Sequence, residues 1–478
     1  MTAATPRFAI TLLIVCLYPA LSQAQSGSPS PQEPASSTPG ALAPAVPPPT
    51  VGPSGVSARD TLTGDWGGLR TNLEAAGVNF GLEEQSELWG NLAGGLRRGG
   101  VYDGLLTPNL TLDLEKLVGW QGAKFFVNAF QIHGRGPSAN LVGNQQLLSN
   151  IEATRGTKLF DLWLEQTLVE GRLIIRIGQE GANDEMMITQ YGAVFLNSSF
   201  GFPGLPAADL PSGGPNYPLA TPFVRVAFHA TDNVTMVGAV FNGDPAPPGI
   251  GDPQERDASG TAFRFNGHSL SFAELWYSAN QGDNAVGLPA IYKLGAWYSS
   301  ARFADQFYDI NGLPLAAPGS SGIPRSHSGD FAIYGIVDQM IWRRSGTTDQ
   351  GIGAFLQVMG SPGGYNVSNL FVEGGIAWKG PFAGHDKDIA AFGVSYLGIS
   401  PAARRFAASV ISLTGSGSSY SSNETVFEAT YLYQATTWLS LQPDAQYVIN
   451  PGAGIPTSES HTPLKNAFVL GVRAAIQF

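Results

Sequence analysis

Charged residues and cysteine are both scarce in this chain. Only 13% of its 478 residues are charged, whereas an average soluble domain carries about 25%. A chain of this length with so few charges must hide a large part of its surface from water. The single cysteine, Cys16, lies near the N-terminus, so a mature protein that begins after it would have no thiol to oxidise in an oxidising compartment.

Long apolar runs are also missing. Beyond the first 24 residues, no continuous apolar stretch approaches the roughly 18 residues that a membrane-spanning helix needs, which excludes a helical membrane protein. The mean hydropathy is +0.01. Strands with alternating apolar and polar residues would keep this mean near zero while one face of each strand meets lipid.

Signatures of catalysis and metal binding are absent from the sequence. The six histidines include no H-E-x-x-H pair, no G-x-S-x-G motif occurs, and GDPAPPGIGDP lacks the ligand spacing of a calcium loop. We expect no catalytic residue, no metal and no cofactor; a hydrolase with a Ser–His pair on a barrel wall is the enzymatic alternative. The formal net charge of -11 and the isoelectric point of about 5.0 argue against nucleic acid as a partner.

The N-terminus has the pattern of a secretory signal. Arg7 is followed by an apolar stretch over 8–21 and then by small residues around Ala24, which suit a cleavage site. We therefore predict that residues 1–24 are a signal peptide and that the protein is exported.

Two short regions follow the predicted signal. Residues 25–58 are mainly Pro, Ser, Ala and Gly and cannot bury enough apolar surface to offset their ordering entropy, so they are expected to form an extended linker. The segment 59–77 is expected to lie in the periplasm and to contain a short helix. Leu69 and Leu73 have helical spacing there, and Gly77 can end the helix.

Amphipathic alternation recurs from residue 78 to residue 478. At the C-terminus, apolar residues occupy every second position: Phe468, Leu470, Val472, Ala474, Ile476 and Phe478. The intervening positions include Arg473, and similar polar faces in FVRVAFHA and TAFRFNG carry Arg225 and Arg264. Repeated ionised groups suit a water-filled lumen and not a sandwich interior. The pattern predicts an all-β fold, a transmembrane antiparallel β-barrel.

The predicted connections have two sizes. Glu170-Gly171 is a tight hairpin turn, whereas 203–222 and 244–260 are long and rich in Gly and Pro. Outer-membrane barrels have short periplasmic turns and long extracellular loops, so the connections favour the same architecture.

Several segments resemble one known family. They are LTGDWGGLRTNLEAAGV (62–78), DLEKLVGWQGAKFFV (113–127), FLNSSFG (195–201), YKLGAWYSSARFAD (292–305) and WLSLQPDAQYVINPG (438–452). The chain from Leu62 to Phe478 is similar to the carbohydrate-selective porins of the OprB type. The resemblance implies an outer-membrane barrel of about sixteen strands that passes small neutral sugars, above all glucose-like ones, by passive diffusion. It also implies that the barrel assembly machinery recognises the closing strand through Phe478.

Other functions and assemblies stay open at this point. A general non-specific porin and a structural envelope barrel are the alternatives to a sugar-selective pore. Any such barrel would contact outer-membrane lipid and lipopolysaccharide, and it would be either a monomer or a homotrimer.

Candidate pore residues lie in the first third of the predicted barrel. A sugar pore needs polar groups that replace water at hydroxyls and surfaces that meet C–H faces. On the first strand, Glu87, Trp89 and Asn91 share one face. Glu83 and Glu84 cannot both point inward without a bulge.

Three further candidates flank the first strands. Asp113 lies on the polar face of NLTLDLEKL. Arg135 and Arg155 lie in predicted connections, from which they either enter the pore on a folded-in loop or remain solvated.

The segment 158–179 predicts a hairpin closed by Glu170-Gly171. Counting back from a two-residue turn places Glu165 opposite Arg176, with both side chains facing the lumen. The pair either contacts the sugar or is a structural cross-strand ion pair. If water bathes it, its contribution to stability is only about 0–1 kcal/mol.

The same hairpin predicts an aromatic surface beside the ion pair. Asp161 and Trp163 share the inward parity of Glu165, whereas Phe160 is expected to face lipid. An acid, an arginine and an indole on one patch could bind a hydroxyl-rich, ring-shaped solute.

Overall fold

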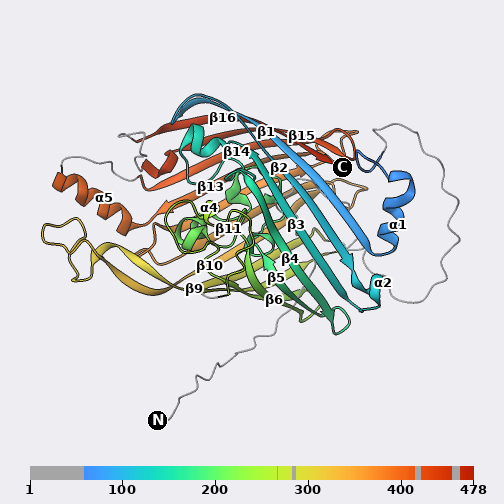
Figure 1. Cartoon of the computed structure of the whole chain (residues 1–478). Helices are drawn as coiled ribbons and strands as arrows, with labels where there is room; N and C mark the ends of the chain where they lie inside the picture. Colours follow the sequence, from blue (N-terminus) through green and yellow to red (C-terminus); the bar gives the residue numbers. More distant parts are fainter. Residues whose placement is uncertain (1–58, 266, 282–286, 415–420, 455–462) are drawn as a thin grey trace, which may run out of the picture.

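Sixteen antiparallel strands form a closed barrel (Figure 1). The computed structural model describes residues 59–265, 267–281, 287–414, 421–454 and 463–478. Each strand pairs with its neighbours in sequence, and β1 pairs with β16 to close the sheet. The predicted signal peptide (1–24) and linker (25–58) lie outside the described residues.

The strands are 8 to 20 residues long. They are β1 (Val78–Gly95), β2 (Gly99–Asp113), β3 (Ala123–Gly134), β4 (Gly156–Leu168), β5 (Leu173–Glu180), β6 (Thr221–His229), β7 (Val234–Asn242), β8 (Ser269–Ala279), β9 (Ala290–Asp309), β10 (Pro324–Arg343), β11 (Gly351–Gly360), β12 (Ser368–Lys379), β13 (Ile389–Ile399), β14 (Asn423–Gln434), β15 (Leu439–Ile449) and β16 (Lys465–Gln477).

Five α-helices accompany the strands: α1 (Leu69–Ala75), α2 (Leu114–Val118), α3 (Gly204–Asp209), α4 (Pro253–Arg256) and α5 (Pro401–Thr414). Among the described residues, no helix is long and apolar enough to cross a membrane. The predicted short N-terminal helix is confirmed as α1. It ends where the sequence indicates, because Gly77 takes the left-handed conformation (φ 96°) and its N–H donates to the carbonyl of Glu74 at 3.0 Å.

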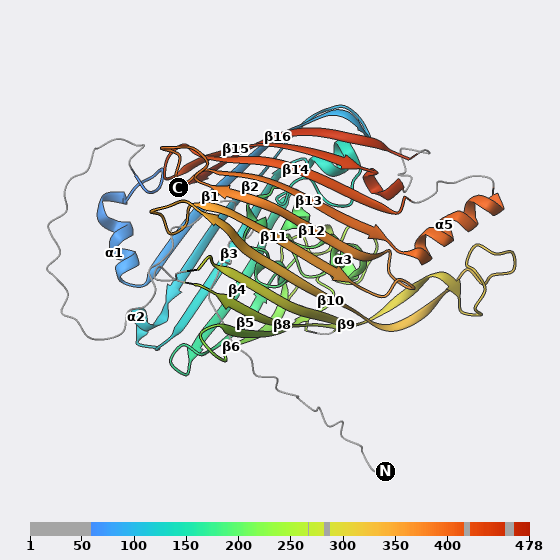
Figure 2. The ribbon, with the colours of Figure 1, turned by 180° about the vertical axis from the view of Figure 1, so that it is seen from behind.

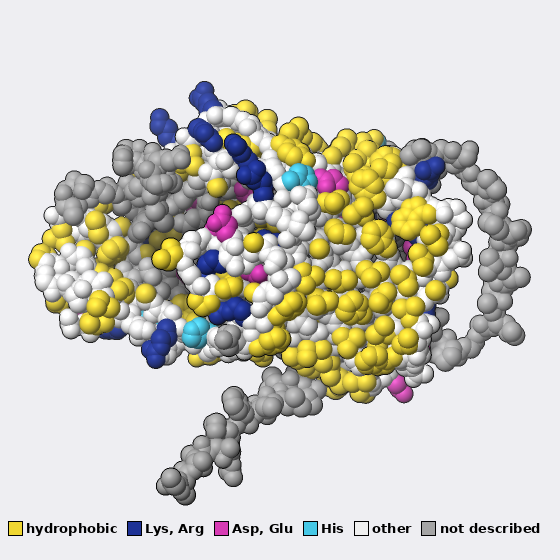
Figure 3. Space-filling model, in the orientation of Figure 1, with side chains coloured by type: hydrophobic (Ala, Val, Ile, Leu, Met, Phe, Trp, Pro, Cys, Tyr) yellow, Lys and Arg dark blue, Asp and Glu magenta, His cyan; other side chains and the backbone are white. Residues whose placement is uncertain are grey.

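The alternation of side chains sets which face of the wall meets lipid. On β16, Leu470 and Val472 are 43% and 38% exposed on the outside, whereas Arg473 is 1% exposed on the inside. The same division recurs around the barrel and leaves a broad hydrophobic surface over β1 to β6 (Figure 3). The barrel fold predicted from alternation is confirmed.

The two rims of the barrel differ in the length of their connections, as the sequence predicts. One rim, the turn rim, carries short connections such as 169–172 and 230–233, together with α1 and the C-terminus (Figures 1 and 2). The opposite rim, the loop rim, carries the long connections 135–155, 181–220 and 243–268. Two of these fold into the barrel; we name 135–155 the first inward segment and 181–220 the second inward segment.

A short stretch of chain crosses the seam between the first and last strands. The N–H of Leu62 donates to the carbonyl of Gln477 at 2.8 Å, and Arg70 on α1 donates to the carbonyl of Phe478 at 2.7 Å. The N–H of Phe478 in turn donates to Leu82 of β1 at 2.9 Å. The segment before β1 is therefore hydrogen-bonded to the end of the chain, which in turn is hydrogen-bonded to β1.

Two expectations about local structure are wrong. The segment TAFRFNG does not form a strand, since β8 begins only at Ser269 and Phe263 has a φ of 39°. Phe160 does not face lipid: the register between β3 and β4 shifts at this point, and the ring is 1% exposed with its centroid 4.7 Å from that of Phe130. A β-bulge inverts side-chain parity, and neither alternation nor composition reveals one.

Candidate functional site

A row of charged side chains crosses five neighbouring strands on the inner face. Each residue lies directly opposite the next: Asp113 (β2), Lys124 (β3), Glu165 (β4), Arg176 (β5) and Arg225 (β6). Because facing positions on adjacent strands share one face of a sheet, the register brings both signs of charge together on one part of the wall.

The predicted pairing of Glu165 with Arg176 is confirmed. The N–H of Arg172 donates to the carbonyl of Val169 at 3.0 Å, so Glu170-Gly171 is the two-residue turn that the register requires. The Nε and Nη2 of Arg176 donate to Oε2 of Glu165 at 3.0 and 2.8 Å.

Arg176 has a second acidic partner that the sequence does not reveal. Its Nη1 donates to Oε2 of Glu180 at 2.8 Å. The neighbouring Arg225 pairs with Glu185 of the second inward segment. The side chains of Arg176 and Glu165 are only 8% and 6% exposed. Lumen water therefore does not bathe the pair of Glu165 and Arg176, because the second inward segment covers it.

Trp163 is held between two other side chains. The ring of Phe126 lies opposite it on β3 with the centroids 5.0 Å apart, and the guanidinium of Arg176 on β5 lies 4.1 Å from the indole centroid. The two contacts come from strands on opposite sides of β4, so both indole faces are covered. Trp163 is 7% exposed and presents no open face on which a sugar ring could stack; its indole instead packs against Phe126 and the guanidinium of Arg176.

Glu87 and Trp89 share the inner face as predicted, but they bind protein groups. The indole Nε1 of Trp89 donates to Glu87 at 2.7 Å, and Nε of Arg473 donates to the same carboxylate at 2.6 Å. Arg473 also donates to Asn150 of the first inward segment at 2.5 Å. This cluster joins β1, β16 and the segment.

Asn91 likewise holds the first inward segment. Its Nδ2 donates to the carbonyl of Leu141 at 3.2 Å and to that of Arg97 at 2.8 Å. Asp161 accepts from Nδ2 of Asn128 on β3 at 2.5 Å and is 4% exposed. Both residues face inward and both act as fasteners of the wall or the segment.

Carboxylates on the far wall accept backbone N–H groups of the two inward segments. In the second inward segment, the N–H of Met187 donates to Glu274 at 2.8 Å. The N–H groups of Gln190 and Tyr191 donate to Asp338 at 3.0 and 3.2 Å. Those of Leu196 and Asn197 donate to Glu428 at 2.6 and 3.0 Å. Glu424 accepts from Gln145 and Gln146 of the first inward segment. The wall thus fixes the main chain of both segments at several points.

Two carboxyl groups of the inward segments have raised pKa values. Burial raises the pKa of Glu152 to about 7, although the hydroxyl and amide of Ser138 donate to this carboxylate and oppose the shift. Burial and the nearby carboxyl of Asp161 raise the pKa of Asp184 well above its usual range. Among the described residues, no cluster of three or more His, Cys, Asp or Glu could hold a metal ion.

The comparison with protein families decides the identity of this barrel. The model described as "Carbohydrate-selective porin, OprB family" matches residues 97–478. The chain belongs to the OprB family. It is an outer-membrane sugar porin, and its family and fold are those of a channel rather than an enzyme.

Curated relatives and solved structures agree with this assignment. Porin B of Pseudomonas aeruginosa is 26% identical over 436 residues, which cover 87% of this chain and 91% of that protein. The putative porin QuiX of Acinetobacter baylyi is 22% identical over 446 residues, with coverages of 88% and 93%. The high-pH structure of Pseudomonas putida OprB has a TM-score of 0.77 and 24% identity, and covers 88% of this chain and 99% of that chain.

Three predicted pore residues of this OprB-family porin lie at its rims. Asp113 ends β2 and caps α2, since its carboxylate accepts from the N–H groups of Glu115 and Lys116 at 3.1 and 3.2 Å. Arg135 and Arg155 are exposed at the loop rim. The structure therefore separates Arg135 and Arg155 from the Glu165 and Arg176 pair.

Several residues of the site are not recognisable as such from the sequence. Lys124 and Arg225 complete the charged row, and Glu424 and Asp338 fix the inward segments. The alternation of FVRVAFHA does place Arg225 on the polar face. Nothing in the sequence shows which strand residues face each other across the barrel or touch a folded-in loop.

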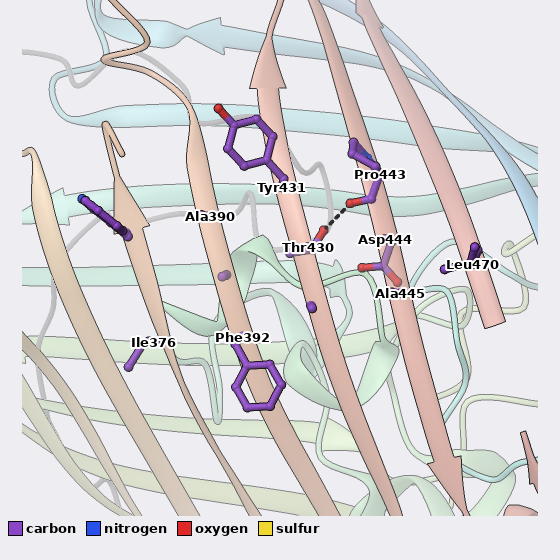
Figure 4. A pocket seen from close by; sticks show the side chains of 12 residues that line it. Ile376, Ala390, Phe392, Thr430, Tyr431, Pro443, Asp444, Ala445 and Leu470 are labelled. Atoms are coloured by element: carbon purple, nitrogen blue, oxygen red, sulfur yellow. Dashed lines mark hydrogen bonds between the residues drawn. The ribbon is translucent and has the colours of Figure 1, made fainter. Parts of the chain in front are cut away.

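A hollow of about 550 Å³ on the outside of the wall is not part of the sugar path (Figure 4). It lies over β12 to β16, where Ala390, Ala429 and Ala445 leave space between larger side chains such as Phe392 and Tyr431. These residues belong to the lipid-facing side of the porin, so the hollow opens toward the membrane.

Proposed function

We propose that this porin passes small, neutral, glucose-like sugars by passive diffusion through the lumen that the two inward segments narrow. The observation that carries the proposal is the accessible end of the charged row, where Lys124 lies opposite Asp113 beside the buried pair of Glu165 and Arg176. An acid and a base side by side can exchange hydrogen bonds with hydroxyl groups while giving this part of the wall little net charge. The exposed member of the row, Lys124, is the side chain most open to a passing solute.

The proposal predicts selectivity beyond size. In a liposome-swelling series, glucose-like monosaccharides should enter faster than uncharged non-sugars of matched size, and disaccharides should enter more slowly than monosaccharides. The physical reason is that a sugar must replace water by protein groups at the narrowest zone. Rates that follow molecular size alone would support a general porin, and the absence of swelling would support a structural envelope barrel.

We further propose that the C-terminal aromatic residue serves assembly and not permeation. Phe478 follows the alternating strand β16 and lies at the turn rim, where Figure 1 marks the C-terminus. Deleting Phe478 should lower the amount of assembled barrel in the outer membrane, while the molecules that do assemble keep the conductance of the parent. Quantifying heat-modifiable protein in outer-membrane fractions and recording single channels would test both parts. Parent-like membrane levels of the deletion would contradict the proposed contact with the assembly machinery.

A further inference from the structure

The outward face of β1 is interrupted by an ionisable residue. Glu83 and Glu84 show no bulge between them, so Glu83 points into the lumen with 6% exposure and Glu84 points outward. Glu84 and Ser86 share the outward parity of Leu88, which is 60% exposed. In the register, Glu84 lies between Ile476 of β16 and Leu106 of β2. An acid at this place on a lipid-facing wall is unfavourable unless something other than acyl chains meets it.

Glu84 belongs to a hydrogen-bonded network on three strands. Its carboxylate accepts from Ser86 at 2.9 Å and lies 3.3 Å from Nε2 of His133 on β3. The hydroxyl of Tyr102 on β2 contacts Nε2 of His133 at 2.9 Å and Ser86 at 3.1 Å. On this side of the barrel, an acidic and a histidine side chain lie next to each other within the hydrophobic surface (Figure 3).

The backbone leaves room for this network. A Cβ atom at Gly104 would lie 2.3 Å from Nε2 of His133, so the imidazole rests on the bare main chain of β2. Nδ1 of His133 contacts the amide oxygen of Gln131 at 3.1 Å. The network therefore has defined geometry and offers both hydrogen-bond donors and acceptors to the membrane side.

Basic side chains lie above the same three strands at the loop rim. Arg97 and Arg98 form the connection between β1 and β2, and Arg135 directly follows β3. All three are exposed, and in the part of the chain that the structure describes none of them pairs with an acidic side chain. Nε of Arg97 donates to the carbonyl of Asn140 at 2.8 Å. Basic residues gather at this end of the surface in Figure 3.

We propose that the outer face of β1 to β3 is a binding site for a phosphorylated glycolipid of the outer leaflet whose acyl linkages carry hydroxyl or amide groups. Long loops of outer-membrane barrels face the cell exterior, so the loop rim lies at the headgroups of that leaflet. Arg97, Arg98 and Arg135 bind the phosphates, because guanidinium groups match phosphate oxygens in charge and geometry. The network of Glu84 and His133 receives the hydroxyl or amide groups deeper in the leaflet.

The charges on this face favour a lipid over a second copy of the chain. Two copies that met through the same face would bring the guanidinium groups of Arg97 and Arg98 at the same rim toward each other. Like charges at one contact are repulsive, whereas an anionic headgroup is complementary to them. Only an amphiphile has its phosphates at the rim and its polar linkages below them.

The site can be tested on the folded, full barrel in detergent by native mass spectrometry with lipopolysaccharide that lacks the O-chain. The double variant Arg97→Gln and Arg98→Gln should bind this probe roughly tenfold to thirtyfold more weakly than the parent. His133→Phe should weaken lipopolysaccharide binding without changing the binding of phosphatidylglycerol, which lacks the hydroxyl and amide linkages. Dephosphorylated lipopolysaccharide should bind the parent at least as weakly as intact lipopolysaccharide binds the arginine double variant, because that variant keeps Arg135.

A matched control removes the same charge elsewhere at the loop rim. Arg302 on β9 and Arg404 on α5 are both exposed, and the double variant Arg302→Gln and Arg404→Gln should bind like the parent. An equal loss in this control, or unchanged binding in both Arg97 and His133 variants, would overturn the proposal. So would a lipid-free dimer of the parent that His133→Phe converts to monomer, since the partner would then be a second copy. Liposome swelling by sugars should stay at the parent rate in all variants, which separates this site from the pore.

Discussion

Replacing Arg176 by glutamine is expected to destabilise the barrel by about 3–5 kcal/mol, the loss typical when one partner of a buried ion pair is removed. Arg176 donates to both Glu165 and Glu180, and all three side chains are less than a tenth exposed. The substitution leaves two carboxylates without their cation. Glu165→Gln should be milder, because Arg176 keeps Glu180 and can still donate to the amide oxygen. Chemical unfolding of the purified barrel in detergent would measure both losses.

Arg172 provides a matched control on the same hairpin. It is an exposed arginine at the turn between β4 and β5, and Arg172→Gln should change stability by less than about 1 kcal/mol. If Arg176→Gln unfolds at the same denaturant concentration as Arg172→Gln, water must reach the pair. Arg176→Gln and Glu165→Gln would then be expected to shift ion selectivity instead, toward cations and toward anions respectively.

Glu424→Gln is expected to loosen the first inward segment and to raise conductance, whereas Asp338→Asn is expected to behave like the parent. Glu424 uses both oxygens: Oε1 accepts from Gln146 at 2.8 Å and Oε2 from Gly452 at 2.6 Å. A glutamine must turn an NH₂ group toward one of these N–H donors. Each charge-assisted hydrogen bond contributes about 1.5–3 kcal/mol, so the loss is large for a loop.

Asp338 differs in one respect that makes it the control. Its Oδ1 accepts both N–H groups, from Gln190 and Tyr191, while Oδ2 has no hydrogen-bond partner among the described residues. Asparagine can keep the accepting oxygen in place. Single-channel recordings should show larger and noisier currents for Glu424→Gln only. Parent-like currents from correctly folded Glu424→Gln would show that this carboxylate does not hold the segment.

The fold could be predicted from the sequence because the patterns that specify it are local. Alternation on strands such as β16 reports directly which side meets lipid, and the turn at Glu170-Gly171 sets the register of the hairpin around it. The cross-strand partner of Glu165 could therefore be identified by counting residues from the turn, without a structure. Phe160 marks the limit of this reasoning, since a single extra residue in the ladder inverts the parity on which every later assignment depends.

The surroundings of the candidate site could not be predicted from the sequence in the same way. Whether Glu165 and Arg176 meet water depends on where residues 181–220 lie, and no periodic pattern in a long loop encodes its path. The contacts of Trp163 and Glu87 likewise come from side chains that are distant in sequence. Alternation identified the inward-facing residues correctly, but it could not distinguish those that meet a solute from those that hold the wall together.

The seam between the first and last strands has a consequence for the order in which the molecule forms. Glu87 and Arg473 meet across it from positions 386 residues apart, and closing a flexible loop of that length costs on the order of 5 kcal/mol in chain entropy. Once the seam is closed, the bonds of Leu62 and Arg70 to the chain end need little further loop closure. We therefore expect the stretch before β1 to dock after the barrel has closed, although it is synthesised before all of the strands.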